Sequence, residues 1–216
     1  MTAVAAWLAL LAALAIAVRR RWDGQTNPQQ REWSRKLVHI GTGAVVLIAW
    51  GFTIDRRIAI PAAAAITLLA GLNHRLRVLP AVEDVGRASY GTVAYGASIT
   101  LLLWQYWPGQ AASVAAGVLV MALGDGLAGL VGPLWPSPSW QVLGQRRSLL
   151  GTGTMAMASL LVLACLGLWV EGPPWPLLLG ITATATLLEQ LAIGGIDNLS
   201  VPLGVAWLWQ QWSGLS

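Results

Sequence analysis

One acidic residue lies near the middle of a long apolar stretch. Asp125 interrupts the sequence GVLVMALGDGLAGLVGPL. A carboxylate at the centre of a membrane helix costs about 2.5–3.5 kcal/mol, and acids in such places usually bind or react. We therefore expect Asp125 to hold a divalent cation or to accept a proton. The alternative is a structural ion pair with an arginine on another helix.

A cationic group opens an earlier apolar run. In the sequence RKLVHIGTG, Arg35 and His39 are four residues apart and Lys36 and His39 are three apart. On a helix such side chains meet, and a cluster of donors of this kind suits phosphate. A histidine whose surroundings leave its pKa unperturbed titrates near neutrality, which suits His39 to proton transfer. The alternative for Arg35 and Lys36 is that they anchor the helix at anionic lipid headgroups.

A second pair of cations precedes another apolar run. Arg146 and Arg147 are followed by Ser148 and, three residues later, by Gly151. Backbone N–H groups at a helix start, combined with cations, form an anion site, so we expect these four residues to bind phosphate. Anchoring on the cytoplasmic side of a membrane would also explain the two arginines.

A polar break separates the last two apolar runs. Glu189 ends one run, and Asp197 and Asn198 open the next. An Asp–Asn pair supplies the oxygen ligands that Mg²⁺ prefers, although Asp197 at a helix start would also serve as an N-cap.

The surroundings of Asp125 are unusually small. Gly124, Gly126, Gly129 and Gly132 leave little side-chain bulk, so another helix or a ligand can approach closely. Together these groups match the needs of phosphoryl transfer, which are bound phosphates, Mg²⁺ and one oriented hydroxyl. In a membrane the acceptor would be a lipid alcohol, with the nucleotide arriving from the cytoplasm.

The elements that carry these groups are apolar helices. The chain has 216 residues, of which 56% are hydrophobic and 10% charged, against about 25% charged in soluble domains. This predicts an all-α, polytopic transmembrane bundle forming one domain over residues 1–216, with about seven spans (six to eight) and a retained first span at 1–18. The apolar runs are 3–18, 37–54, 58–72, 89–107, 111–132, 148–169, 174–193 and 199–212.

The loops predict an orientation. Eleven of the 13 basic residues fall in loops on one side, and only Arg56 and Arg57 fall on the other. The positive-inside rule then places the rich side in the cytoplasm and the N-terminus outside. We expect the tryptophans near run ends, Trp107 and Trp209 among them, to form interface belts, and the single Cys165 to pack in the core. Since topology explains the basic residues, we expect no nucleic-acid partner.

Five segments in this order resemble the CTP-dependent lipid-alcohol kinases, the family of phytol kinase, dolichol kinase and yeast-type diacylglycerol kinase. The likeness is greatest to the phytol kinases of photosynthetic organisms and runs over residues 31–205. The segments are RKLVHIGTG, RASYGTVAYGASI, LGDGLAGLVG, RRSLLGTGTM and EQLAIGGIDNLSVPL.

The resemblance implies transfer of phosphate from CTP to phytol, or to a related isoprenoid alcohol, in a plasma or thylakoid membrane. The product would feed tocopherol synthesis. By resemblance, Mg²⁺ lies between Asp125, Asp197 and Asn198, and Arg35, Lys36, Arg146 and Arg147 hold phosphates, with Ser148 and Gly151 beside them. His39 or Glu189 orients the acceptor hydroxyl.

Several alternatives stay open from the sequence. The substrate can instead be a polyprenol, dolichol or diacylglycerol, and the enzyme can be a membrane cytidylyltransferase. A small membrane transporter or an inactive family member is the non-enzymatic alternative. The CDP-alcohol phosphotransferases are excluded, because Gly129 stands where their motif carries an arginine. The oligomeric state cannot be inferred from the sequence.

Overall fold

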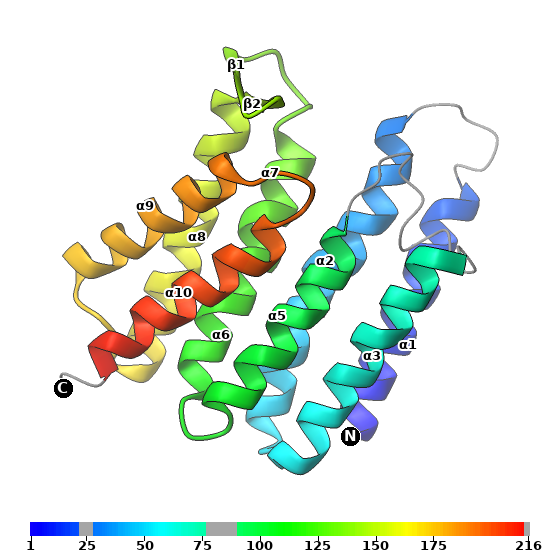
Figure 1. Cartoon of the computed structure of the whole chain (residues 1–216), viewed down its shortest axis with the longest axis vertical. Coiled ribbons are helices and arrows are strands. Elements are labelled where there is room, and N and C mark those ends of the chain that lie inside the picture. The colour runs from blue at the N-terminus through cyan, green and yellow to red at the C-terminus, as the bar shows by residue number, and fades with distance from the viewer. Residues whose placement is uncertain (22–27, 77–89, 214–216) are drawn as a thin grey trace.

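The fold is a bundle of antiparallel helices capped at one end by a small hairpin (Figure 1). The computed structural model describes the backbone of residues 1–21, 28–76 and 90–213, and the side chains of 1–18, 33–76 and 90–212. Each apolar run of the sequence becomes a helix, because a backbone in lipid must satisfy its own hydrogen bonds. The all-α expectation is therefore confirmed at the level of the bundle.

The helices follow the chain in simple order. They are α1 (Thr2–Arg21), α2 (Pro28–Gly51), α3 (Arg56–Leu76), α5 (Gly91–Tyr106), α6 (Ala111–Leu119), η1 (Val120–Asp125), α7 (Gly126–Val131), α8 (Leu149–Val170), α9 (Trp175–Leu191) and α10 (Asp197–Ser213). The short strands β1 (Ser139–Val142) and β2 (Gln145–Ser148) pair antiparallel between α7 and α8.

Three of the described helical segments are long and apolar enough to cross a membrane, namely α3, the continuous segment Ala111–Val131, and α8. The Ala111–Val131 segment is central, since 56% of its apolar window is buried inside the protein, against 6% in α3. It packs on α2, α5, α8 and α10. Asp125 thus lies on the most enclosed of the three.

The central segment is not a regular α-helix. It comprises α6, the π-helical turn η1 and α7, and Asp125 is the last residue of the π-helical turn. Wide π turns inside α-helices are rare and often occur at functional sites. The turn changes the direction in which the following residues point, and this sets the position of Asp125 relative to α2.

Three expectations from the sequence are corrected. Cys165 is exposed on the outer face of α8 and does not lie in the core. Trp107 and Trp209 are buried, and the Trp107 indole donates to the Ile54 carbonyl at 2.8 Å, so neither contributes to an interface belt. Arg146 and Arg147 lie on β2, because a hairpin precedes the helix that they were expected to open.

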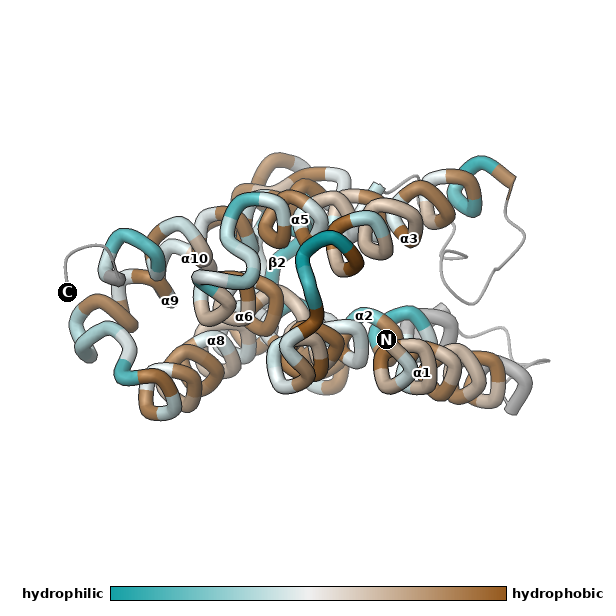
Figure 2. Tube along the Cα trace, turned by 90° about the horizontal axis from the view of Figure 1, so that it is seen from below, coloured by the Kyte–Doolittle hydropathy of each residue, from teal (hydrophilic) through white to brown (hydrophobic). Residues whose placement is uncertain are grey.

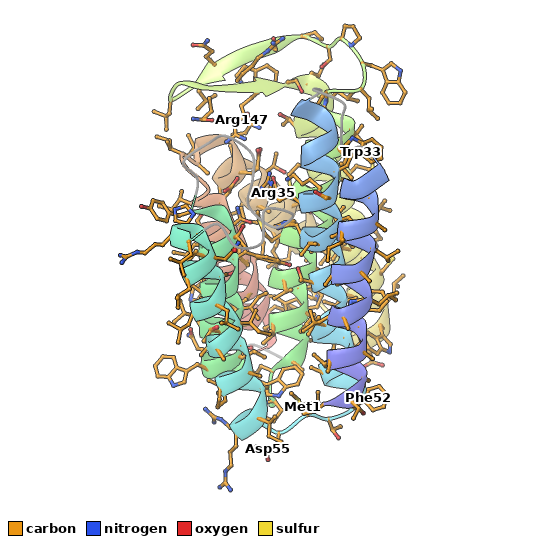
Figure 3. All side chains as sticks on the ribbon, turned by 90° about the vertical axis from the view of Figure 1, so that its right-hand side faces the viewer. Met1, Trp33, Arg35, Phe52, Asp55 and Arg147 are labelled. Carbon is orange, nitrogen blue, oxygen red and sulfur yellow. The ribbon has the colours of Figure 1, made fainter. Side chains whose placement is uncertain are left out.

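The candidate site residues gather at one end of the bundle. In Figure 3, Arg35 and Arg147 lie toward the hairpin end, and Met1, Phe52 and Asp55 lie at the opposite end. Figure 2 views the molecule from the Met1 end, where the start of α3 is hydrophilic among mostly apolar helices. The side chains of Arg19–Arg21, Arg31, Arg77 and Arg87, which the orientation argument used, lie outside the described residues.

Candidate active site

The centre of the polar end is an ion pair between α2 and the π-helical turn. Lys36 Nζ donates to Asp125 Oδ2 at 2.6 Å and to the Asp125 carbonyl at 3.1 Å. His39 Nε2 lies 3.4 Å from the same carboxylate oxygen and 3.2 Å from the Met121 carbonyl. Because π geometry lets carbonyls diverge from the regular ladder, the Met121 and Asp125 carbonyls can serve as partners for α2.

This pair is largely withdrawn from solvent, with the side chains of Lys36 and Asp125 only 7% and 18% exposed. Breaking one partner of a buried pair typically costs about 3–5 kcal/mol, because the other charge is left unpaired. The partner of Asp125 is therefore a lysine with a histidine beside it, and not the arginine that the structural alternative assumed.

Glycines let the two helices approach closely enough for this contact. A Cβ on Gly129 would lie 2.4 Å from Lys36 Cε, and one on Gly126 would lie 2.3 Å from Ile40 Cγ1. On other faces of the segment, a Cβ on Gly124 would lie 2.6 Å from Met155 Sδ, and one on Gly132 would lie 3.3 Å from the Gly151 Cα. The small surface around Asp125 is used for close approach of α2 and α8.

A second buried ion pair links the hairpin to α9. The Arg147 guanidinium donates to a carboxylate oxygen of Glu189, to the Glu189 carbonyl, and to the Ala192 carbonyl at 3.1 Å. Gln190 Nε2 donates to the other Glu189 oxygen at 2.8 Å and to Thr152 Oγ1 at 2.9 Å. Both Glu189 oxygens are thus engaged, which leaves this residue poorly placed to orient a hydroxyl.

Asp197 and Asn198 form the start of α10 near the same end. Asp197 Oδ1 accepts from the Asn198 backbone N–H at 3.0 Å and from the Asn198 amide at 3.2 Å. The carboxylates of Asp125, Asp197 and Glu189 lie near enough to one another to interact electrostatically, with Lys36 and Arg147 in range. These bonds go to the adjacent residue and not to the N2 or N3 N–H that an N-cap would engage. The first turn of α10 closes on the Ile196 carbonyl instead, so the cap interpretation of Asp197 is not supported.

The start of α8 departs from the expected anion site. Its first three backbone N–H groups donate to Pro138 O at 2.9 Å, Ser137 Oγ at 3.4 Å and Ser148 Oγ at 3.1 Å, respectively. Ser148 is therefore the N-cap of α8, and Gly151 gives its N–H to that cap. These amides are already used by the protein, so phosphate binding here depends on side-chain cations.

The two arginines of β2 have different surroundings. Arg147 is half-buried in its pair with Glu189, and Arg146 is exposed. Successive residues of a strand point to opposite faces, so the two side chains do not form one cradle. Arg35 lies within electrostatic range of the Asp125 carboxylate.

One residue of the site was missed in the sequence. The Tyr95 ring on α5 stacks against His39 with centroids 4.4 Å apart. Its hydroxyl is buried and has no hydrogen-bond partner among the described residues. Thr42, whose hydroxyl lies nearby, donates instead to the His39 carbonyl at 2.8 Å. The signal in the sequence was a tyrosine between small residues in an apolar helix.

The chemistry of the donors fits Mg²⁺. The described residues contain no group of three or more His, Cys, Asp or Glu side chains arranged to hold a metal ion. Mg²⁺, however, is usually held by one or two carboxylates together with phosphate oxygens and water. Asp125 and Asp197, with the amide oxygen of Asn198, supply oxygen donors of that kind.

Comparison with known proteins gives the relationship. The phytol kinase of Synechocystis sp. is 44% identical over 187 residues, which cover 85% of this chain and 79% of that protein. The chain belongs to the phytol kinase family. No family model and no solved structure matches it. The resemblance drawn from the five sequence segments is therefore confirmed.

Three of the five segments that resemble the phytol kinase family meet around the Asp125 carboxylate. RKLVHIGTG supplies Lys36 and His39, LGDGLAGLVG supplies Asp125, and RASYGTVAYGASI supplies Tyr95. The two remaining segments meet in the pair of Arg147 with Glu189. An enclosed carboxylate beside cations and hydroxyl groups can bind a phosphate–metal complex and an alcohol together.

Proposed function

We propose that this protein transfers the terminal phosphoryl group of CTP to an isoprenoid alcohol, with phytol as the first candidate. The transfer takes place at the cytoplasmic face of the membrane and yields the alkyl monophosphate and CDP. The observation that carries the proposal is the 44% identity to a phytol kinase over most of both chains. The clustering of the matched segments around Asp125 supports it.

In this reaction the alcohol oxygen forms a bond to the γ-phosphorus, and the bond from that phosphorus to the β-phosphate oxygen breaks. The alcohol proton leaves to a nearby base or to water. His39 is better placed than Glu189 to orient the alcohol, because it lies between Asp125 and Tyr95, while both Glu189 oxygens are engaged. Lys36, Arg35 and Arg147 supply positive charge for the phosphates.

Mg²⁺ would be held by Asp125, Asp197 and Asn198. When bound, the ion neutralises charge on the nucleotide phosphates as the bond to the leaving group breaks. Lys36 contacts the Asp125 carboxylate, so its ammonium group lies where it can also donate to an oxygen of a phosphate bound beside that carboxylate.

The test is a transfer assay with the purified full chain in detergent. CTP labelled at the γ-phosphate and, separately, at the α-phosphate is offered with Mg²⁺ and with phytol, geranylgeraniol, a polyprenol or diacylglycerol. We expect γ-label on an isoprenoid alcohol and no α-label. Transfer of α-label to phytyl monophosphate, offered in a parallel reaction, would instead indicate a cytidylyltransferase, and label on diacylglycerol alone would reject the isoprenoid assignment.

The same assay tests the donor and the metal. Parallel reactions with γ-labelled ATP decide the nucleotide. Chelation with EDTA should abolish transfer, and added Mg²⁺ should restore it. The proposed site contributes only two or three of the six ligands that Mg²⁺ takes, so the protein holds the ion weakly enough for EDTA to remove it. Full activity in EDTA would remove Asp125 and Asp197 from a metal role.

If no alcohol is labelled from either nucleotide while the protein is folded, the kinase proposal fails. Flux of substrate into proteoliposomes without nucleotide would then favour a transporter. Neither transfer nor flux would favour an inactive family member.

A further inference from the structure

An apolar cleft runs down from the candidate active site between two pairs of helices. α1 packs along α2 and α3 packs along α5, and the two pairs share few neighbours across the cleft. Figure 2 shows this arrangement from below, with α3 over α1 and α5 over α2. The walls are almost entirely apolar, and small alanines predominate on α3.

The upper end of the cleft begins at the candidate active site. Thr42, Thr67 and Gly96 line this end. Thr42 donates to the His39 carbonyl, one turn above it, and Gly96 directly follows Tyr95. The Tyr95 hydroxyl, which has no hydrogen-bond partner among the described residues, lies near the Thr42 side chain and therefore beside the upper end of the cleft. A buried polar atom without a partner costs about 1–3 kcal/mol, and an incoming hydroxyl group would relieve that cost.

The length of the cleft fits a membrane lipid. From the level of His39 to that of Ala49 the rise of α2 is about 15 Å. That is about half of the roughly 30 Å hydrocarbon core, the depth of one leaflet. The lower end is lined by Ala49, Ile54, Ala59 and Leu103. An alcohol with its hydroxyl at Tyr95 would lay its chain along this path.

The cleft must widen to take a chain. Its volume is about 130 Å³, and ligand pockets usually measure about 300–1,000 Å³. The sparse contact between the α1–α2 pair and the α3–α5 pair is the place where it can widen, because separating the pairs leaves the packing within each pair intact.

A second hollow is larger but faces the wrong way. A groove of about 680 Å³ lies between α8 and the η1–α7 segment. It is lined by Leu123 and Leu127, each two residues from Asp125. Two residues turn a helix by about 200°, so this groove opens on the side away from Asp125. A chain held there would keep its hydroxyl far from Lys36 and His39.

We propose, resting on the proposed function, that the cleft between the α1–α2 and α3–α5 pairs binds the hydrocarbon chain of the isoprenoid alcohol. The Tyr95 hydroxyl positions the alcohol oxygen beside His39 and Asp125. Ala59 and Leu103, at the lower end, limit the length of chain that fits.

Chain-length selectivity tests the cleft. Phosphorylation of geraniol, farnesol and phytol is measured for the wild type, for Ala59→Phe at the lower end of the cleft, and for Ala158→Phe in the outer groove. Ala59→Phe should lower kcat/KM for phytol at least about tenfold relative to geraniol, whose shorter chain ends above the new ring. Ala158→Phe should leave the ratio unchanged. An unchanged ratio in Ala59→Phe, or a shifted ratio in Ala158→Phe, would overturn the proposal.

Tyr95→Phe tests the positioning role. The variant should raise KM for the alcohol or lower kcat about threefold to tenfold, the loss of one neutral hydrogen bond, with KM for CTP unchanged. A general structural defect would change both substrates alike and would remove Tyr95 from this role.

A binding measurement separates this inference from the kinase proposal. The wild-type protein is photolabelled with a phytol analogue that carries a diazirine near the chain end, and the labelled peptides are sequenced. Label in α3 near Ala59, or in α5 near Leu103, supports the cleft even if no phosphate is transferred. Label concentrated in α8 at Met157–Leu161, or no site-specific label, would overturn it.

Discussion

The two ends of the bundle both carry charged residues, and they organise them differently. At the end that holds Met1, the Asp55 side chain accepts from the Arg57 backbone N–H at 2.7 Å, two residues away, and Arg56 donates to the Trp104 carbonyl in an exposed contact. At the hairpin end, Lys36 meets Asp125 across 89 residues of chain, and Arg147 meets Glu189 across 42. Both of these pairs are largely buried.

The difference separates local anchoring from a built site. Asp55 caps the start of α3, which any helix near a membrane surface requires. The long-range pairs instead hold four elements together around withdrawn charges. Burying charge is costly unless it is paired. The buried charges at the hairpin end therefore do more than set the orientation of the protein in the membrane.

The largest effect should follow from Asp125→Asn. Kinase turnover should fall by about a hundredfold to a thousandfold, as when a principal electrostatic group is removed from an active site. The variant also leaves Lys36 buried without its partner, so part of the loss could come from unfolding, at about 3–5 kcal/mol.

The double variant Asp125→Asn with Lys36→Gln separates the two causes. It removes both charges and should regain thermal stability in detergent while staying inactive. A stable double variant with wild-type turnover would show that this pair is only structural, and the contrast between the two ends would disappear.

Gly129→Ala should have the next largest effect on activity, with a smaller loss of stability than Asp125→Asn. The new methyl would lie 2.4 Å from Lys36 Cε, so the flexible lysine must move off Asp125. We expect kcat/KM to fall about tenfold or more and the melting temperature to fall as well, because the buried Asp125 carboxylate loses part of its pairing. Gly180→Ala on α9, where a Cβ meets nothing within 4 Å, is the matched control and should keep full activity.

Arg147→Lys should have an intermediate effect. The lysine keeps the charge but loses the planar fork that reaches Glu189 and two carbonyl groups. We expect a reduction of about fivefold to tenfold in kcat/KM for CTP. Arg146→Lys, at the exposed neighbour on β2, should change little. Equal losses in both variants would mean that the burial of Arg147 has no functional importance.

Asp55→Ala should have the smallest effect. Loss of the cap should cost about 1 kcal/mol of stability and leave the kinetic constants unchanged, because Asp55 lies at the end opposite the cluster. Asp55→Asn, which keeps a capping oxygen, should preserve stability as well. A kinetic defect in either variant would place functional residues at both ends.

The sequence predicted the helices well and their contacts poorly. All eight apolar runs became helical, because hydrophobic length determines what spans a bilayer. The π-helical turn could not be predicted, since it depends on how the central segment packs against its neighbours. The hairpin was not predicted. Its turn has positive φ at both Leu143 and Gly144, as in a tight hairpin turn, but a leucine at the first position does not signal such a turn in the sequence. Four-residue exposed strands give too weak a pattern to detect.

The candidate site shows the same limit. Residue types indicated Asp125, Lys36 and His39 as candidates. Their contact could not be predicted, because residues 89 positions apart in the chain form no local sequence pattern. The start of α8 was predicted as an anion site from its two arginines and the backbone N–H groups of a helix start. The structure instead gives those amides to Pro138, Ser137 and Ser148, which only the preceding turn could supply.

The π-helical turn at Val120–Asp125 has a consequence for insertions and deletions. A π turn accommodates a residue beyond the α-helical repeat, so the two halves of the central segment are out of register with each other. Deleting Ala122 would remove the extra residue and restore a regular helix, in which the residues after the turn keep their directions. α6 would keep its packing against α10, but the Met121 and Asp125 carbonyls would return to the regular hydrogen-bond ladder and no longer serve His39 and Lys36. The number of residues in this turn is therefore under a stricter constraint than their identity.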